Sequence, residues 1–508
     1  MKATRSVVIG LVSVAAALAA GHLVAGLISP LASPFLAVGN TAIDLTPHPV
    51  KDFAIRTFGE NDKLVLLGGM AVVLAGLGVV AGLLSRRSPW PGTALAGVLG
   101  LLGLAAVLAR PTSTTWAFVA PLASLVVGVL AFRWLWSRAS AQAPAEAVST
   151  EAPGRRKFLA STGAIAAGAG VAALGGQWFA GRVDVEASRR AITLRPRVKA
   201  PEIPFDADFV REGTPPFMTP LDKFYRVDTA LSIPRLRAED WRLRVHGMVD
   251  NEMVLTYDDL LRRPLEEKTI TLVCVSNEVG GPYISTANFI GVSLSDLLRD
   301  AGVRPGSDQL ATRSVDGWTC GTPVESIMAP GSNAMLAIGM NGEPLPLERG
   351  FPVRMVVPGL YGYVSATKWL VDMELTTFDA FDPYWAQRTW AKKAPVKTMS
   401  RIDRPKSFER VPAGKFVVAG IAWAQHTGID RVEVRVDGGP WQETTLSTEV
   451  NVDTWRMWRV ELDLKEGNHT VECRATDRKG YTQTDQRAAP IPDGATGWHS
   501  MVFTSVAG

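Results

Sequence analysis

Cys274 is the residue of this 508-residue sequence whose chemistry stands out first. It ends a β-branched run that starts at Thr269, and a polar turn through Ser276 and Asn277 follows it. The chain has three cysteines and no Cys-x-x-Cys spacing, so an exported protein of this composition keeps at least one thiol for another role. A thiolate there could hold a soft metal. A cysteine at the end of a buried strand is more often a small core residue, and Cys274 alone does not separate the two.

Four further segments give Cys274 a context. A helix pattern, Gly-x-x-Leu-x-x-Leu-Leu, begins at Gly291, and a Phe-Tyr-Arg segment lies upstream at 224–226. Downstream, residues 341–362 carry Arg349 and Arg354 among Gly and Pro, and an Ala-Thr-Lys-Trp-Leu element follows at 366–370. In this order the segments resemble the sulfite oxidase family of molybdenum enzymes, over about residues 200–390.

The resemblance implies a site with one molybdenum-molybdopterin cofactor per chain. Cys274 would be the single protein ligand of the metal, and Cys274, Arg226 and Trp390 would be the catalytic residues. The pyranopterin ends in a phosphate, which suits Arg forks, a Lys charge and backbone N–H groups. A single Arg or Lys is more commonly a solvated surface charge. The cofactor-binding residues implied are Tyr225, Arg226, Cys274, Asn277, Ser314, Arg349, Arg354, Ala366, Thr367 and Lys368.

The sequence departs from the sulfite-oxidising pattern at two positions. Those relatives carry an Arg shortly after the metal-binding Cys, whereas residues 275–279 here are Val, Ser, Asn, Glu and Val. They also carry a Tyr where this chain has Trp390. Arg226 remains as an anion contact, but Glu278 would repel a dianion by roughly 1 kcal/mol in wet surroundings. Sulfite oxidation therefore competes with reduction of an S- or N-oxide of the methionine sulfoxide type.

The elements that must position these residues are short. Residues 181–220 indicate an extended lead-in, and the alternation at 242–247 predicts a half-buried strand. Thr256 is a plausible N-cap for the short helix that follows it. Runs at 417–423, 429–436, 455–462 and 469–475 predict an all-β domain over 395–505. This part resembles the immunoglobulin-like domain that follows the catalytic domain in the same family, where it commonly mediates dimerisation; Cys473 is expected in its core.

The N-terminal part has five stretches long and apolar enough to cross a membrane. They are about 7–29, 64–84, 92–110, 114–136 and 158–180, with a tight turn at Arg110-Pro111 and a loop at 30–63. Positive residues gather before the first span, after the second and between the fourth and fifth. We therefore expect a cytoplasmic N-terminus and an extracytoplasmic catalytic half, whereas four or six spans would move the soluble half.

The segment from Gly154 to Ala160, Gly-Arg-Arg-Lys-Phe-Leu-Ala, resembles a twin-arginine export signal. The alternative is an ordinary positive anchor before a span. Two axial histidines on facing spans would be needed for haem, and His22 is the only histidine inside a predicted span, so no haem is expected in this chain.

The predicted organisation is multi-domain. Residues 1–138 form a transmembrane region of four spans, and 139–181 contain a linker, the twin-arginine-like motif and the fifth span. Residues 182–392 form an α+β molybdopterin domain, and 393–508 the immunoglobulin-like sandwich. The expected partners are a small-molecule substrate, the lipid bilayer, a separate electron-transfer protein or quinone, and a second copy in a homodimer. A net charge of +4 without a basic aromatic helix argues against nucleic acid. The competing class is a non-enzymatic, membrane-anchored adhesion protein.

Overall fold

The computed structural model describes residues 1–507 except 48–49, 51–52, 55–56, 59–60, 111–115, 141–152 and 182–183. Its contacts divide the chain into two units. Unit 1 comprises Met1–Asp184 with Thr229–Pro234, and unit 2 comprises Val185–Asp228 with Arg235–Gly508. The division after Asp184 falls shortly beyond the fifth apolar stretch of the sequence.

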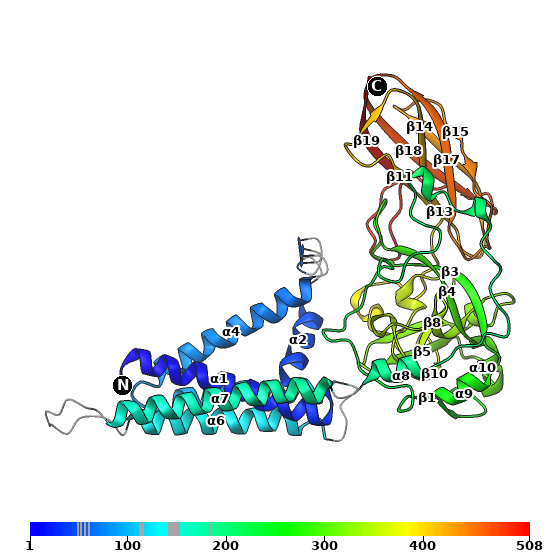
Figure 1. Ribbon diagram of the computed structural model, residues 1–508. Coiled ribbons are helices and arrows are strands. Elements are labelled where there is room, and N and C mark those ends of the chain that lie inside the picture. The colour runs from blue at the N-terminus through cyan, green and yellow to red at the C-terminus, as the bar shows by residue number, and fades with distance from the viewer. Residues whose placement is uncertain are drawn as a thin grey trace. The chain divides into compact units, whose positions relative to one another are not determined.

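Unit 1 is helical. α1, α6 and α7 lie side by side, and α1 also packs against α4 (Figure 1). Five of its helices are long and apolar enough to cross a membrane, as the sequence predicts. The helices of this unit are α1 (Ala3–Ile28), α2 (Pro34–Leu45), α4 (Asp62–Leu84), α5 (Trp90–Leu108), α6 (Val119–Ser140) and α7 (Pro153–Gly181).

Small residues set the close packing of α1 on α4. A Cβ added to Gly10 would lie 1.8 Å from the Gly78 carbonyl oxygen, so only glycine fits there. Large apolar residues lie on the surface of the unit; Val72 and Leu174, for example, are each 73% exposed. Such surfaces suit a lipid environment better than water.

In unit 1, the expected loop at 30–63 is partly helical, and two further predicted segments lie mostly outside the described residues. The stretch expected to be a loop at 30–63 contains α2, whose proline at its first position suits a helix start. The rest of the tight turn after Arg110 and most of the linker at 139–153 lie outside the described residues.

Unit 2 begins with one mixed sheet and one antiparallel sheet, which share one large core. The first has the order β2-β1-β10-β5-β6, and the second has the order β3-β4-β7-β8 with β9 paired to β7. The strands of the first sheet are β1 (Arg242–Gly247), β2 (Met253–Thr256), β5 (Gln309–Ser314), β6 (Thr319–Pro323) and β10 (Leu370–Thr376). Those of the second are β3 (Glu266–Val273), β4 (Ile284–Ser293), β7 (Met335–Met340), β8 (Glu343–Pro344) and β9 (Arg354–Val356).

Short helices connect these strands. Thr256 caps α9 as predicted, because its hydroxyl accepts from the Asp259 amide while Asp259 accepts from the Thr256 amide. The lead-in expected to be extended contains the seven-residue α8, which corrects that expectation locally. The helices are α8 (Val185–Ala191), α9 (Tyr257–Arg262), α10 (Leu294–Ala301) and α11 (Val324–Met328).

The C-terminal part of unit 2 consists of two further sheets around a second core, which includes Cys473. Their orders are β11-β13-β17-β16 and β12-β19-β18-β14-β15. The first holds β11 (Met399–Arg404), β13 (Gly414–Trp423), β16 (Thr445–Leu446) and β17 (Arg456–Leu464). The second holds β12 (Arg410–Pro412), β14 (Ile429–Val436), β15 (Gln442–Glu443), β18 (Gly467–Asp477) and β19 (His499–Val506).

Candidate metal and anion site

Cys274 comes directly after β3, where the strand leaves the sheet. The neighbouring Val273 and Val275 belong to the large core, but Cys274 is not among the described residues of that core. Burial raises the pKa of the Cys274 thiol, while hydrogen bonding from Ser276 and the charge of Lys368 act in the opposite direction. The thiol therefore lies within electrostatic reach of a buried cation, which an ordinary core cysteine does not need.

The turn after Cys274 is tied together by its own backbone. The Cys274 amide donates to the Tyr283 carbonyl at 3.0 Å, and the Asn277 amide donates to the Cys274 carbonyl at 3.0 Å. The side-chain oxygen of Asn277 accepts from the Tyr283 amide at 2.8 Å. Asn277 is buried, and its side-chain oxygen and its backbone amide together hold the backbone of the turn that follows Cys274.

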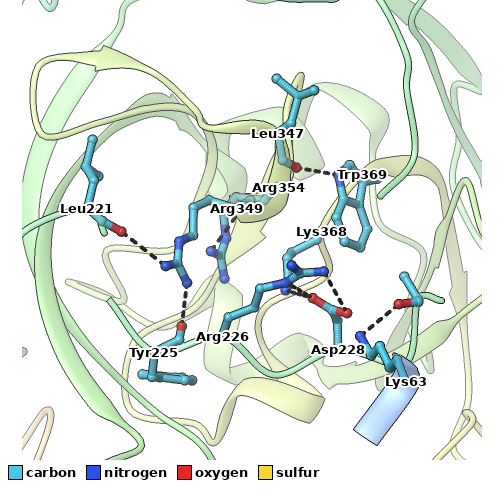
Figure 2. Close-up of polar contacts among 11 residues, drawn as sticks. Lys63, Leu221, Tyr225, Arg226, Asp228, Leu347, Arg349, Arg354, Lys368 and Trp369 are labelled. Carbon is cyan, nitrogen blue, oxygen red and sulfur yellow. Dashed lines mark hydrogen bonds and ion pairs between the residues drawn. The ribbon is translucent and has the colours of Figure 1, made fainter. Parts of the chain in front are cut away.

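Four basic side chains gather in unit 2 from three distant parts of the chain (Figure 2). Arg349 donates to the Tyr225 carbonyl at 2.7 Å and to the Leu221 carbonyl at 3.1 Å. Lys368 and Arg226 both pair with Asp228, each at 2.8 Å. The fourth is Arg354, which donates to the Arg349 carbonyl at 3.3 Å.

Gly350 allows two of these cations to approach each other. Its φ is +111°, and a Cβ added there would lie 3.0 Å from the Lys368 Cβ and 3.1 Å from the Arg354 Cβ. Trp369 connects the segment that carries Lys368 to the segment before Gly350, because its indole N–H donates to the Leu347 carbonyl at 2.8 Å. The Trp369 carbonyl in turn accepts from the Val315 amide, next to Ser314 at the end of β5.

Tyr225 connects the cations to the cysteine. The charge of Cys274 contributes to the raised pKa of its phenol, after burial, whereas Arg354 and Arg349 act to lower it. A Cβ added to Gly362 would lie 3.7 Å from both the Tyr225 hydroxyl and the Val273 carbonyl oxygen, and 3.9 Å from the Ala366 Cβ. The segments that carry Tyr225, Val273 and Ala366 therefore meet at Gly362.

Burial weakens the basicity of this cluster. It lowers the pKa of Lys368 to about 8, although Asp228 opposes the shift. It lowers the pKa of Arg354 to about 10, with the charge of Arg349 adding to the effect. Cations held in this way favour a bound anion, because an anion compensates their lost hydration.

The cluster fits a phosphate-bearing cofactor. The Nε atoms of Arg349 and Arg354 are buried and have no hydrogen-bond partner among the residues that the structure describes. Buried donors of this kind are normally satisfied, so they indicate an acceptor that comes from outside the chain. Among the described residues, no group of three or more His, Cys, Asp or Glu could hold a metal.

The remaining predicted site residues make the following contacts with their neighbours. Thr367 is buried with its hydroxyl 2.6 Å from that of Thr312, and Ser314 is buried at the end of β5. The Ala366 amide donates to the Gly362 carbonyl. Trp390 packs its ring 5.7 Å from that of Tyr363, next to Gly362, so it adjoins the site through an intervening aromatic side chain.

The acidic side of the site was not predicted from the sequence. Asp228 is 6% exposed and pairs with both Arg226 and Lys368. Burial raises the pKa of Asp316, which also lies within electrostatic reach of Asp228 and Lys368. The spacing of Arg226 and Asp228 on one side of an extended segment could have indicated their pairing.

Comparisons with known proteins identify similar proteins over the same part of the chain. Residues 230–385 match the family model of the oxidoreductase molybdopterin binding domain. The chain is 31% identical to the mitochondrial sulfite oxidase of Rattus norvegicus over 57% of this chain and 61% of that protein. It is 28% identical to an inducible nitrate reductase of Glycine max, over 53% of this chain and 37% of that protein.

A solved structure supports the fold. The sulfane dehydrogenase SoxCD from Paracoccus pantotrophus matches with a TM-score of 0.50 and 24% identity, over 57% of this chain and 84% of that chain. At this identity the match shows the fold alone. The chain spans 61% of the length of the rat, mouse and human sulfite oxidases that it matches.

Proposed function

We propose that residues 230–385, which match the molybdopterin-binding family model, form an oxidoreductase domain of the sulfite oxidase family, and that the whole chain is a membrane-anchored enzyme for oxygen-atom transfer. The observation that carries the proposal is the position of Cys274. Its thiol lies at the end of β3, within electrostatic reach of Lys368 and of Tyr225, whose carbonyl holds Arg349.

Each part of the site has a role in this proposal. Cys274 is the thiolate ligand, and its loss of a proton is favoured by the metal charge when the cofactor is bound. Arg349, Arg354 and Lys368 hold the pterin phosphate. The bound molybdenum centre supplies the two-electron oxygen-atom chemistry. The pterin-lining residues are Tyr225, Asn277, Ser314, Ala366 and Thr367.

Arg226 and Trp390 are proposed to contact the substrate. Arg226 is the most exposed of the four cations, with 32% of its side chain accessible, so it can face an incoming anion. Trp390 has a buried indole N–H without a partner among the described residues, and it can donate to a substrate oxygen. Asp228 neutralises part of the Arg226 charge and would weaken the attraction of a dianion.

We place sulfite oxidation first among the reactions, because relatives about 30% identical are named sulfite oxidases. The second candidate is reduction of a neutral S- or N-oxide. It is motivated by the residues after Cys274, which include Glu278 and no basic side chain. A purely adhesive protein does not account for the molybdopterin-binding domain.

The surroundings of the enzyme are also part of the proposal. Five apolar helices anchor the chain in a membrane, and the positive loops favour an extracytoplasmic catalytic half reached by twin-arginine export. Electrons would pass to or from a separate protein or a quinone. The C-terminal two-sheet domain would be immunoglobulin-like and would join two copies.

A dye-coupled assay on the full chain in detergent tests the reaction. Sulfite is offered with an oxidised dye, and methionine sulfoxide and trimethylamine N-oxide are offered with a reduced dye. We expect sulfite-dependent dye reduction that Cys274→Ala abolishes and that Cys473→Ala, at a buried cysteine of the C-terminal core, retains. Turnover of the oxides alone would select the second reaction, and no turnover by molybdenum-loaded protein would reject the proposal.

A further inference from the structure

The turn that carries Cys274 is held from the C-terminal domain by one buried cation. Arg401 lies in β11 and is 9% exposed. Its Nη1 donates to the Gly281 carbonyl at 2.8 Å, while its Nε and Nη2 each lie 2.9 Å from Oδ1 of Asp403. Gly281 lies two residues before Tyr283, whose carbonyl accepts from the Cys274 amide.

A second contact closes the same side of the turn. Gly280 has a φ of +81°, and a Cβ added there would lie 2.3 Å from Nε2 of His499 in β19. The other nitrogen of that ring, Nδ1, accepts from the Ile402 amide at 2.9 Å. The turn from Asn277 to Tyr283 is therefore packed between its own hydrogen bonds and two strands of the C-terminal domain.

Stability alone gives a poor reason for a buried pair at this place. An Arg–Asp pair taken out of water is often no more stabilising than apolar side chains of similar volume. Oδ2 of Asp403 has no hydrogen-bond partner among the described residues, so the hydrogen-bonding capacity of the pair is incompletely used. What the pair does provide is a directed, charge-assisted bond to one carbonyl of the turn.

We propose that Arg401 is a positioning residue, which fixes the Cys274 sulfur by holding the Gly281 carbonyl from the C-terminal domain. The inference rests on the proposed function, in which Cys274 is the metal ligand. It assigns the C-terminal domain a part in the site that is separate from joining two copies. Arg401 acts only through the turn, and no contact with substrate is implied.

The test measures the turn without any metal. In the cofactor-free full chain, we expect iodoacetamide to react with Cys274 when the turn opens, because the residue is only 8% exposed. Losing a bond from a charged donor should make Arg401→Met react about tenfold faster. Arg401→Lys keeps one donor and should react at an intermediate rate. The alkylated peptide is identified by mass spectrometry, which separates Cys274 from the other two cysteines.

Arg404→Met is the matched control. Arg404 lies in the same strand, but its guanidinium stacks 4.7 Å from the ring of Phe416, a residue of the C-terminal core. It should leave the rate unchanged. Equal alkylation rates for wild type and Arg401→Lys, or equal acceleration by Arg401→Met and Arg404→Met, would overturn the proposal. If Arg401→Met does not fold, the Arg401→Lys rate decides.

A second readout uses the loaded protein. Arg401→Lys should shift the thiolate-to-metal absorption band and lower kcat while KM stays unchanged. A wild-type chain that takes up no molybdenum would reject the proposed function, yet the alkylation rates would still test the role of Arg401.

Discussion

Burial and mutual repulsion set the charge of the basic cluster around Lys368. Arg354 and Lys368 lose hydration on burial, and the carboxylate of Asp228 compensates Lys368 by a direct ion pair. The guanidinium of Arg354 keeps an unsatisfied Nε. An anion that enters the cluster therefore gains hydrogen bonds that the protein itself does not use.

The pH dependence of anion binding follows from Lys368. Its pKa in the folded chain is about 8, below the ordinary 10.5, so between these values the unfolded chain binds more protons and Lys368 makes the free energy of unfolding rise with pH. Anion binding has the opposite sign, because only protonated Lys368 attracts phosphate. The thermal stabilisation of cofactor-free protein by inorganic phosphate should fall as pH rises through about 8. In Lys368→Arg it should stay level, and a parallel fall in both proteins would contradict this account.

Removing the Arg354 guanidinium should release the cofactor. A hydrogen bond to a charged group contributes about 1.5–3 kcal/mol, so Arg354→Met should retain the pterin about ten- to a hundredfold more weakly. The fluorescence of pterin released from dialysed protein measures this retention. Arg244→Met is the control, since Arg244 forms an exposed pair with Glu252 in the same domain. Equal losses in both variants would count against a specific role.

At the scale of elements, glycine at 350 determines whether the cations can meet. Gly350→Ala should lower the free energy of unfolding by about 1–3 kcal/mol, because it adds left-handed strain to a clash with Lys368 and Arg354. It should also lower the retained pterin. Gly306→Ala carries similar backbone strain at φ +89°, but its nearest neighbour is the Met248 methyl carbon at 3.8 Å. Urea unfolding and pterin content measure both effects, and unchanged pterin in Gly350→Ala would contradict the geometry.

Local patterns predicted the elements better than the site. The alternation at 242–247 matches β1, and the cap at Thr256 is confirmed. The β-branched run before Cys274 is part of β3, which ends at Val273. Nothing local indicates that Arg226 and Lys368 share Asp228, because that pairing depends on how two distant segments meet. The hydrogen bond from Arg401 to the Gly281 carbonyl joins residues that are 120 positions apart, so no local sequence pattern indicates it.

At the scale of the whole molecule, the proposed extracytoplasmic position of the catalytic half requires a route across the membrane. A chain that receives its cofactor before crossing must cross folded, which is the route of twin-arginine export. Arg155 and Arg156 lie in α7, although their side chains are outside the described part of the structure.

Replacing this arginine pair should stop export. In Arg155→Lys/Arg156→Lys, protease added to spheroplasts should no longer cleave residues 182–508, which it should cleave in the wild type. Arg86→Lys/Arg87→Lys changes another pair next to an apolar helix and keeps the same charge, so it should leave cleavage unchanged. Cleavage of the first variant at the wild-type level would mean that the pair is an ordinary anchor.

The sulfur of Cys274 is tested most directly by X-ray absorption at the molybdenum edge. Full-length wild-type protein and Cys274→Ser are purified in detergent and checked for equal pterin content. We predict that the wild-type spectrum contains one molybdenum–sulfur bond more than that of Cys274→Ser, because the pterin supplies its own sulfurs in both. The same number of molybdenum–sulfur bonds in the two proteins would contradict the assignment of Cys274 as the metal ligand.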